Sequence, residues 1–219
     1  MLAIMVASFI VQKMLESRFE EYSKVPSPDG LTGADVARRM LQDHGITDVE
    51  VVHIKGKLTD HYNPKDKTLN LSDAVYGSAS IAAAAVAAHE CGHAVQHAEA
   101  YGPLQLRSAM VPVVSFASSW VQWILLAGVI FIDIFPQLLW IGIALFGLTT
   151  LFSFVTLPVE VDASQRAVNW LSRTGIADGT TAPMASNALH WAAYTYVIAA
   201  IGSIATLLYY IEMASNSRR

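Results

Sequence analysis

The chain has 219 residues, of which 53% are hydrophobic and only 15% charged, and its mean hydropathy is +0.40. Soluble domains carry roughly a quarter charged residues, so this composition predicts membrane-spanning segments and excludes a disordered chain. The net charge of −4 excludes the basic character typical of nucleic-acid binding. A single cysteine, Cys91, excludes an internal disulfide framework and a cysteine-rich zinc site.

The first element in chain order is an apolar segment, residues 1–12, which ends before Lys13. Twelve residues make about 18 Å of helix, too short to cross a hydrocarbon core of roughly 30 Å. The segment lacks a basic leader and a small-residue cleavage site, so we do not expect a secretory signal peptide. We predict a short N-terminal membrane helix over residues 1–15.

An aqueous α+β part is expected to follow, over residues 16–107. Apolar side chains recur at helical spacing in residues 33–41, which predicts a helix. The β-branched run 49–54 predicts a strand, and residues 58–62 are expected to pair with 68–71 across a turn.

Ser72 or Asp73 is expected to cap the next helix, an alanine-rich run at 81–88 that leads into a His-Glu-Cys-Gly-His motif. His89 and His93 are four residues apart, so on a helix they share one face and can bind one zinc ion. Between them, Glu90 suits a general base that takes a proton from the attacking water and donates it to the leaving amine. The alternative is a pair of surface histidines with an incidental glutamate.

Catalytic zinc needs a third protein ligand and an open position. Glu99 stands six residues after the second histidine, where we expect a solvated side chain. Glu160 is the better candidate, because a helix expected to begin directly after the second span would put it on the same side as His89. Asp162 points about 200° away from it and is predicted to orient a ligating histidine from behind, with Arg166 pairing to it. Glu160 could instead simply interact with the helix dipole.

Three segments without charged residues or histidine are long enough to span a membrane, at 108–132, 134–159 and 191–211. A tight hairpin around Asp133 joins the first two, and Pro158 is expected to end the second. Three crossings place 12 of the 14 basic residues on one side, if the two tail arginines are counted on the other. The positive-inside tendency therefore predicts that the motif faces the cytoplasm.

Taken together, these stretches resemble the YugP-type neutral zinc metallopeptidases, bacterial membrane proteins grouped with the gluzincins and distantly similar to HtpX-like proteases. The resemblance covers nearly the whole chain and rests on residues 60–65 (DHYNPK), 89–96 (HECGHAVQ), 157–164 (LPVEVDAS) and 194–196 (YTY). It implies His89, His93 and Glu160 as zinc ligands and Glu90 as the catalytic residue. The short N-terminal helix and His190 depart from the family's expected pattern.

Several other residues are weaker candidates. His61 and Tyr62 end an expected edge strand just before the metal helix, where backbone pairing could hold an extended substrate. His190, Tyr194 and Tyr196 lie at the entrance of the last span, where one could stabilise the oxyanion or all could anchor the helix at the interface.

We therefore expect an α-helical membrane protein with a small α+β zincin-like catalytic part, three full transmembrane helices and a short N-terminal membrane helix. The expected segments are the N-terminal helix (1–15), the catalytic part (16–107), a transmembrane hairpin (108–159), the third-ligand helix and loop (160–190) and the last transmembrane helix with the tail (191–219).

The predicted function is a zinc-dependent endopeptidase of the bacterial plasma membrane, with its active site at the cytoplasmic surface. Its partners would be Zn²⁺, the lipid bilayer, and peptide or membrane-protein substrates. Two alternatives stay open: a non-proteolytic membrane scaffold or metal-binding protein, and an intramembrane zinc protease.

Overall fold

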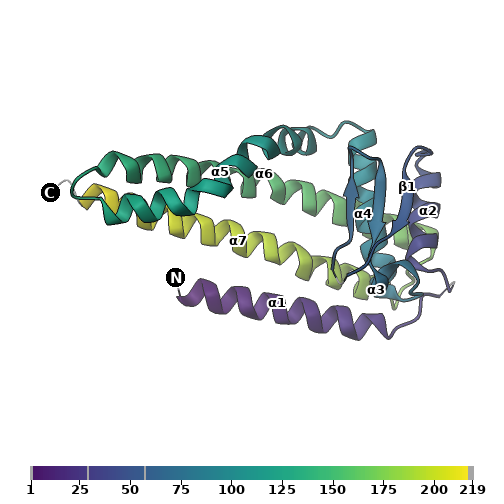
Figure 1. Cartoon of the computed structure of the whole chain (residues 1–219). Coiled ribbons are helices and arrows are strands. Elements are labelled where there is room, and N and C mark those ends of the chain that lie inside the picture. Colours follow the sequence, from purple (N-terminus) through teal and green to yellow (C-terminus); the bar gives the residue numbers. More distant parts are fainter. Residues whose placement is uncertain (1, 29, 57, 217–219) are drawn as a thin grey trace.

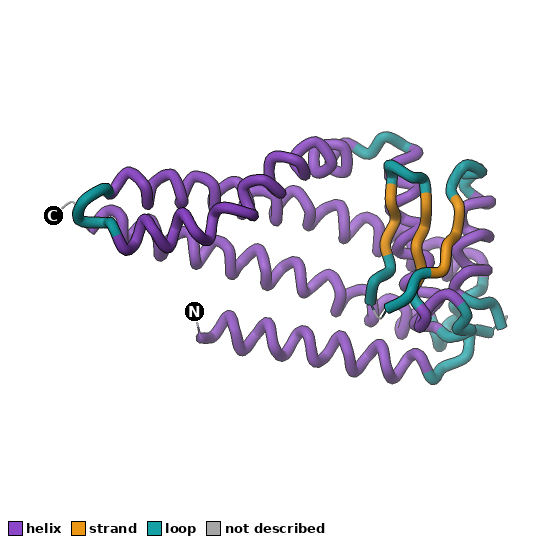
Figure 2. The backbone as a smooth tube through the Cα atoms, viewed as in Figure 1, coloured by secondary structure: helices purple, strands orange, loops and turns teal. Residues whose placement is uncertain are grey.

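The computed structural model describes residues 2–28, 30–56 and 58–216, and long helices dominate it (Figure 1). Met1 and residues 217–219, which belong to the first and last predicted segments, lie outside the described residues. A small sheet lies at one end of the long helices (Figure 2). In chain order the elements are α1 (Leu2–Ser23), α2 (Gly33–Asp43), β1 (Glu50–His53), β2 (His61–Asn63), β3 (Thr68–Leu71), α3 (Asp73–Tyr76), α4 (Ile81–Ala98), α5 (Gly102–Ile130), α6 (Pro136–Thr174) and α7 (Ala182–Asn216).

The three predicted spans are confirmed as helices. Among the described residues, α5, α6 and α7 are long and apolar enough to cross a membrane. Large apolar side chains stay exposed along them, as expected where lipid rather than water is the solvent; Phe116, Trp123 and Leu208 are examples.

The prediction that the second span ends at Pro158 and that a new helix begins at Glu160 is wrong. Pro158 lies inside α6, which continues without interruption to Thr174 and ends at Gly175 in the left-handed conformation. Proline removes one backbone donor and disfavours a helix interior. α6 packs against α4, α5 and α7, and these tertiary contacts offset that local penalty.

The N-terminal helix is longer than the apolar segment that predicted it. α1 continues past Lys13, and i,i+3 ion pairs such as Lys13–Glu16 and Arg18–Glu21 line its exposed polar half. It packs along α7, where Ile4 approaches Gly202. α1 is not among the three candidate spans, so its insertion into a membrane stays a prediction.

The predicted strands form one three-stranded sheet with the order β1-β3-β2. β2 and β3 pair antiparallel, with Tyr62 opposite Leu69, as the sequence predicts. β1 pairs parallel to β3, an arrangement that the sequence analysis did not predict. β2 is therefore an edge strand.

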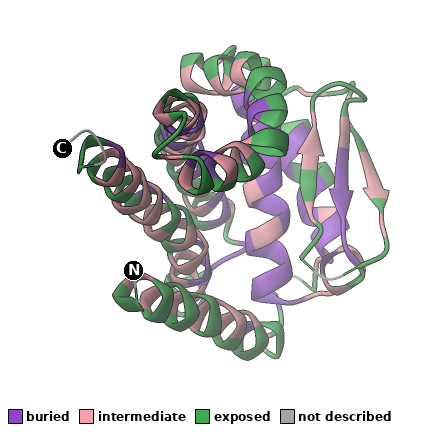
Figure 3. Cartoon of the chain, turned by 60° about the vertical axis from the view of Figure 1, so that its left-hand side comes forward, coloured by how far each residue is buried: buried purple, intermediate pink, exposed green. Residues whose placement is uncertain are grey.

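The predicted metal helix is α4, and most of its residues are buried (Figure 3). Its alanine-rich first half is buried, and the helix as a whole packs mainly against α6 and α2. The prediction that Ser72 or Asp73 caps this helix is wrong, because the short helix α3 follows Ser72. The N-cap of α4 is Ser80, whose side chain accepts a hydrogen bond from the Ala83 N–H.

The backbones of α4 and α6 lie close together at Gly92. A Cβ atom built on Gly92 would lie 2.7 Å from the Ala163 carbonyl oxygen and 3.0 Å from the Ala163 Cα. These neighbours are backbone atoms, which cannot move aside as a flexible side chain can. The motif therefore needs a glycine between its histidines for packing.

We predict that Gly92→Ala destabilises the protein by about 1–3 kcal/mol, because the overpacked helices must separate. The higher helix propensity of alanine offsets at most about 1 kcal/mol of this cost. The matched control is Gly147→Ala in α6, where the added methyl group meets nothing within 4 Å. Thermal unfolding in detergent measures both variants; a Gly92→Ala melting temperature equal to that of Gly147→Ala would contradict the prediction.

Candidate metal centre

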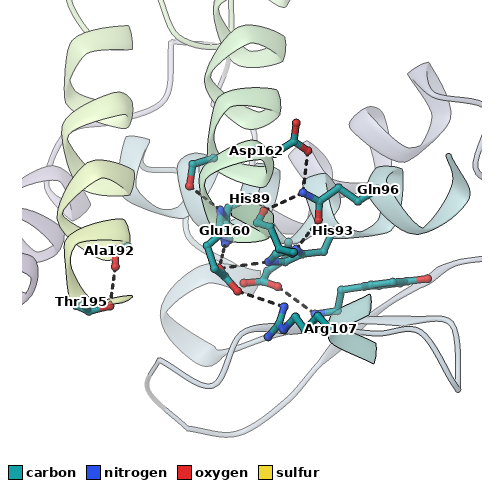
Figure 4. A network of polar contacts seen from close by, with 12 residues as sticks. His89, His93, Gln96, Arg107, Glu160, Asp162, Ala192 and Thr195 are labelled. Atoms are coloured by element: carbon teal, nitrogen blue, oxygen red, sulfur yellow. Dashed lines mark hydrogen bonds and ion pairs between the residues drawn. The ribbon is translucent and has the colours of Figure 1, made fainter. Parts of the chain in front are cut away.

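Three candidate ligand atoms converge between α4 and α6 (Figure 4). The Glu160 Oε2 atom lies 3.3 Å from His89 Nε2 and 3.6 Å from His93 Nε2. Zinc bonds of about 2.0–2.1 Å at tetrahedral angles would separate such donors by about 3.3–3.4 Å. The donor types and their spacing therefore fit one zinc ion.

The three donors come from two helices. His89 and His93 are one turn apart on α4, and their rings make an edge-to-face contact with centroids 4.8 Å apart. Glu160 lies in the interior of α6, with a side chain only 4% exposed. An interior position excludes the alternative role of Glu160 as a carboxylate at a helix N-terminus.

The outer nitrogen of each imidazole has a polar partner. His89 Nδ1 lies 3.1 Å from Ser164 Oγ, and His93 Nδ1 lies 3.0 Å from Gln96 Oε1. Such partners fix the ring and its tautomer, leaving the Nε2 lone pair for the metal.

Gln96 fixes the His93 tautomer without ambiguity. Its fully buried amide nitrogen donates to the Val159 carbonyl oxygen and to Asp162, both at 2.8 Å. Because both partners there are acceptors, the amide oxygen must face His93, and His93 Nδ1 must carry the proton. Asp162 is therefore connected to His93 indirectly, through the hydrogen bonds of Gln96.

The predicted pair of Arg166 with Asp162 is present at 2.6 Å. Arg166 also donates to Glu99 at 2.7 Å. The Glu99 side chain is 55% exposed and makes its ion pair away from the histidines, as expected for a solvated residue rather than a ligand.

Arg107, near the start of α5, contacts the other carboxylate oxygen of Glu160. Its Nη1 atom lies 3.3 Å from Glu160 Oε1, so Oε2 alone faces the histidines. Burial lowers the pKa of His93, yet the hydrogen bond to Glu160 and the charges of Glu90 and Glu160 outweigh it and raise the pKa above its ordinary value. A negative potential that stabilises a protonated imidazole also favours a divalent cation.

Glu90 lies beside the ligands in a cavity of about 160 Å³, which His89 and Glu160 also line. Its Oε2 atom accepts a hydrogen bond of 3.0 Å from the Tyr62 N–H. The free edge of β2, on the side away from β3, therefore faces the Glu90 carboxylate.

The weaker candidates separate in space. His61 is exposed on β2 and bonds to the Thr59 carbonyl oxygen. The Tyr62 hydroxyl group lies 2.9 Å from His97 Nδ1, outside the cavity. His190 and Tyr194 do not line the Glu90 cavity either.

Tyr194 is 47% exposed and packs against the Trp191 ring. Tyr196, two residues further along α7, does line the cavity and interacts with Glu160.

Sequence reasoning missed Gln96, Ser164 and Arg107 as neighbours of the ligands. Helical spacing offered a signal for the first two, since Gln96 is three residues after His93 and Ser164 is four residues after Glu160. No local pattern marks Arg107, because its contact depends on how α5 packs.

The chain is similar to known proteins over almost its whole length. A family model described as "Putative neutral zinc metallopeptidase" matches residues 1–215. The chain is 41% identical over 217 residues to a Bacillus subtilis protein named "Putative membrane protease YugP", covering 99% of this chain and 96% of that one. No solved structure matches.

We predict that Gln96→Met weakens zinc binding about 10- to 100-fold, because His93 loses the acceptor that fixes its tautomer. Competition with a chelator measures the zinc affinity. The matched control, Gln42→Met, changes an exposed side chain on α2 and should leave the affinity unchanged. Equal zinc affinities for the two variants would contradict the role of Gln96.

Proposed function

Because the chain belongs to the family described as "Putative neutral zinc metallopeptidase", we propose that it is a membrane-embedded zinc endopeptidase that hydrolyses peptides or membrane proteins. One observation carries the proposal: His89 and Glu160, two of the three converging donors, line a cavity together with Glu90, a carboxylate that is not needed as a ligand. This arrangement supports hydrolysis more than simple metal storage.

Zinc held by His89, His93 and Glu160 would activate a water molecule and polarise the substrate carbonyl group. Glu90 takes the proton from the attacking water and delivers it to the leaving amine. The Tyr62 N–H orients the Glu90 carboxylate for this task.

Of the three candidates at the start of the last span, Tyr196 lines the Glu90 cavity, whereas Tyr194 and His190 do not. We assign the Tyr196 hydroxyl group to stabilising the oxyanion, because it lines the same cavity as Glu90.

We propose the cytoplasmic surface of the bacterial plasma membrane as the place of action. With three crossings, the segment before α5 and the α6–α7 connection lie on one side. These segments carry most of the basic residues, and cytoplasmic segments are enriched in lysine and arginine.

Glu160→Ala is predicted to lose most of the zinc, because only two protein ligands remain. Glu90→Gln should retain about one zinc per chain and lose peptide hydrolysis, because the general base is gone. Metal analysis of detergent-purified protein, with a peptide-cleavage assay, measures both effects. Glu99→Gln is the control and should keep its zinc.

Full zinc occupancy in Glu160→Ala would place the third ligand elsewhere. Unchanged cellular function in Glu90→Gln would favour the scaffold alternative.

Membrane orientation is testable with two single introduced cysteines, because the native Cys91 is buried. We predict that an impermeant maleimide labels Ile134→Cys on intact cells, since Ile134 is 83% exposed in the α5–α6 loop. Lys65→Cys, in the turn after β2, should react only after the membrane is permeabilised. The reverse pattern would put the candidate active site outside the cytoplasm.

A further inference from the structure

A second cavity, of about 140 Å³, lies between α6 and α7 beside the Glu90 cavity. The two cavities share three lining residues, Ser164, Leu189 and Ala193. Ser164 is also the residue that bonds to His89 Nδ1. The second cavity therefore begins directly behind a candidate metal ligand.

The sequence explains why this space exists. One face of each helix lines it, at positions spaced i, i+3, i+4 and i+7 from Val161 in α6 and from Ser186 in α7. Larger side chains normally fill such a seam. Here Ser164, Ser186 and Ala193 leave a gap between the helices.

We propose that this second cavity is a specificity subsite that holds one neutral, leucine- or phenylalanine-sized side chain of the substrate, next to the bond that is cut. The proposal rests on the proposed function and names the substrate class for the same site.

Size and charge both select this occupant. A cavity of about 150 Å³ holds a benzene-sized apolar group, whereas drug-sized ligands need about 300 Å³ or more. The walls are mixed: Val161, Val168, Leu189 and Ala193 are apolar, whereas Ser164, Gln165, Asn169, Ser186 and His190 are polar. None of the lining residues is Asp, Glu, Lys or Arg. A charged side chain would lose part of its hydration there without gaining an Asp, Glu, Lys or Arg partner for an ion pair.

The position of the cavity also fits an extended polypeptide. Its lining residues follow Glu160 along α6 and precede Tyr196 along α7, so the cavity extends away from the apolar part of both helices. A substrate chain seated there can leave towards water while its scissile bond stays at Glu90.

The test compares short peptide hydroxamates whose side chain next to the zinc-binding group is Gly, Ala, Leu, Phe, Asp or Lys. We expect the zinc-loaded protein to bind the Leu and Phe compounds at least about 10-fold more tightly than the Gly compound. Calorimetry measures this preference without any turnover. The Asp and Lys compounds should bind no better than the Gly compound.

Ser186→Leu fills the second cavity without touching the residues shared with the Glu90 cavity, and it should abolish the preference for Leu and Phe. Ser186→Ala removes only the hydroxyl group and should retain the preference. Ser172→Leu makes the same change at an exposed position of α6 that lines neither cavity, and should also retain it.

Binding of all six compounds with equal affinity would overturn the subsite, as would a preference that survives Ser186→Leu or a failure of every hydroxamate to bind. A size preference in binding without detectable peptide hydrolysis would leave the subsite standing and overturn the proposed protease activity. Peptide hydrolysis without a size preference in binding would support the protease activity and overturn the subsite.

Discussion

The close contact between α4 and α6 is the constraint on which the candidate metal centre depends, because the ligands are divided between these helices. His89 and His93 come from α4, and Glu160 comes from α6. Gly92 lets the two backbones meet, and Gln96 joins them through hydrogen bonds to the Val159 carbonyl oxygen and to Asp162. A shift of about 1 Å between the helices would move a carboxylate out of bonding range of a metal held by the histidines. The candidate metal centre therefore depends directly on the packing of α4 against α6.

The polar groups around the site are arranged so that each has a distinct partner. Glu160 offers one oxygen to Arg107 and the other to the histidines, while Glu90 receives the Tyr62 N–H. Buried carboxylates are costly unless they are paired. The partners come from α5 and β2, so the site needs the membrane-capable helices as well as the aqueous part. This dependence explains why no single segment of the sequence contains the whole centre.

The elements with a strong local pattern were predictable, and those decided by packing were not. The helical spacing of His89 and His93 and the apolar length of the spans are local signals, and both recur in the structure. Pro158 misled the sequence analysis because the penalty of a proline is local, whereas the contacts that keep α6 continuous come from elsewhere in the chain. The contact of Arg107 with Glu160 likewise joins distant positions, and the parallel pairing of β1 has no signature in its own residues.

The length of the continuous helix α6 determines how far Glu160 lies from the opposite end of the span. From Pro136 to Glu160 the helix advances 24 residues, which at 1.5 Å per residue is about 36 Å. A hydrocarbon core of roughly 30 Å would leave the Glu160 carboxylate only about 6 Å beyond it, level with the lipid headgroups. The continuous helix would set that height, so substrates would be selected by the distance of the cleaved bond from the membrane as well as by their side chains. A peptide bond deep in the bilayer, or in a folded domain far from the membrane, would not reach the candidate active site.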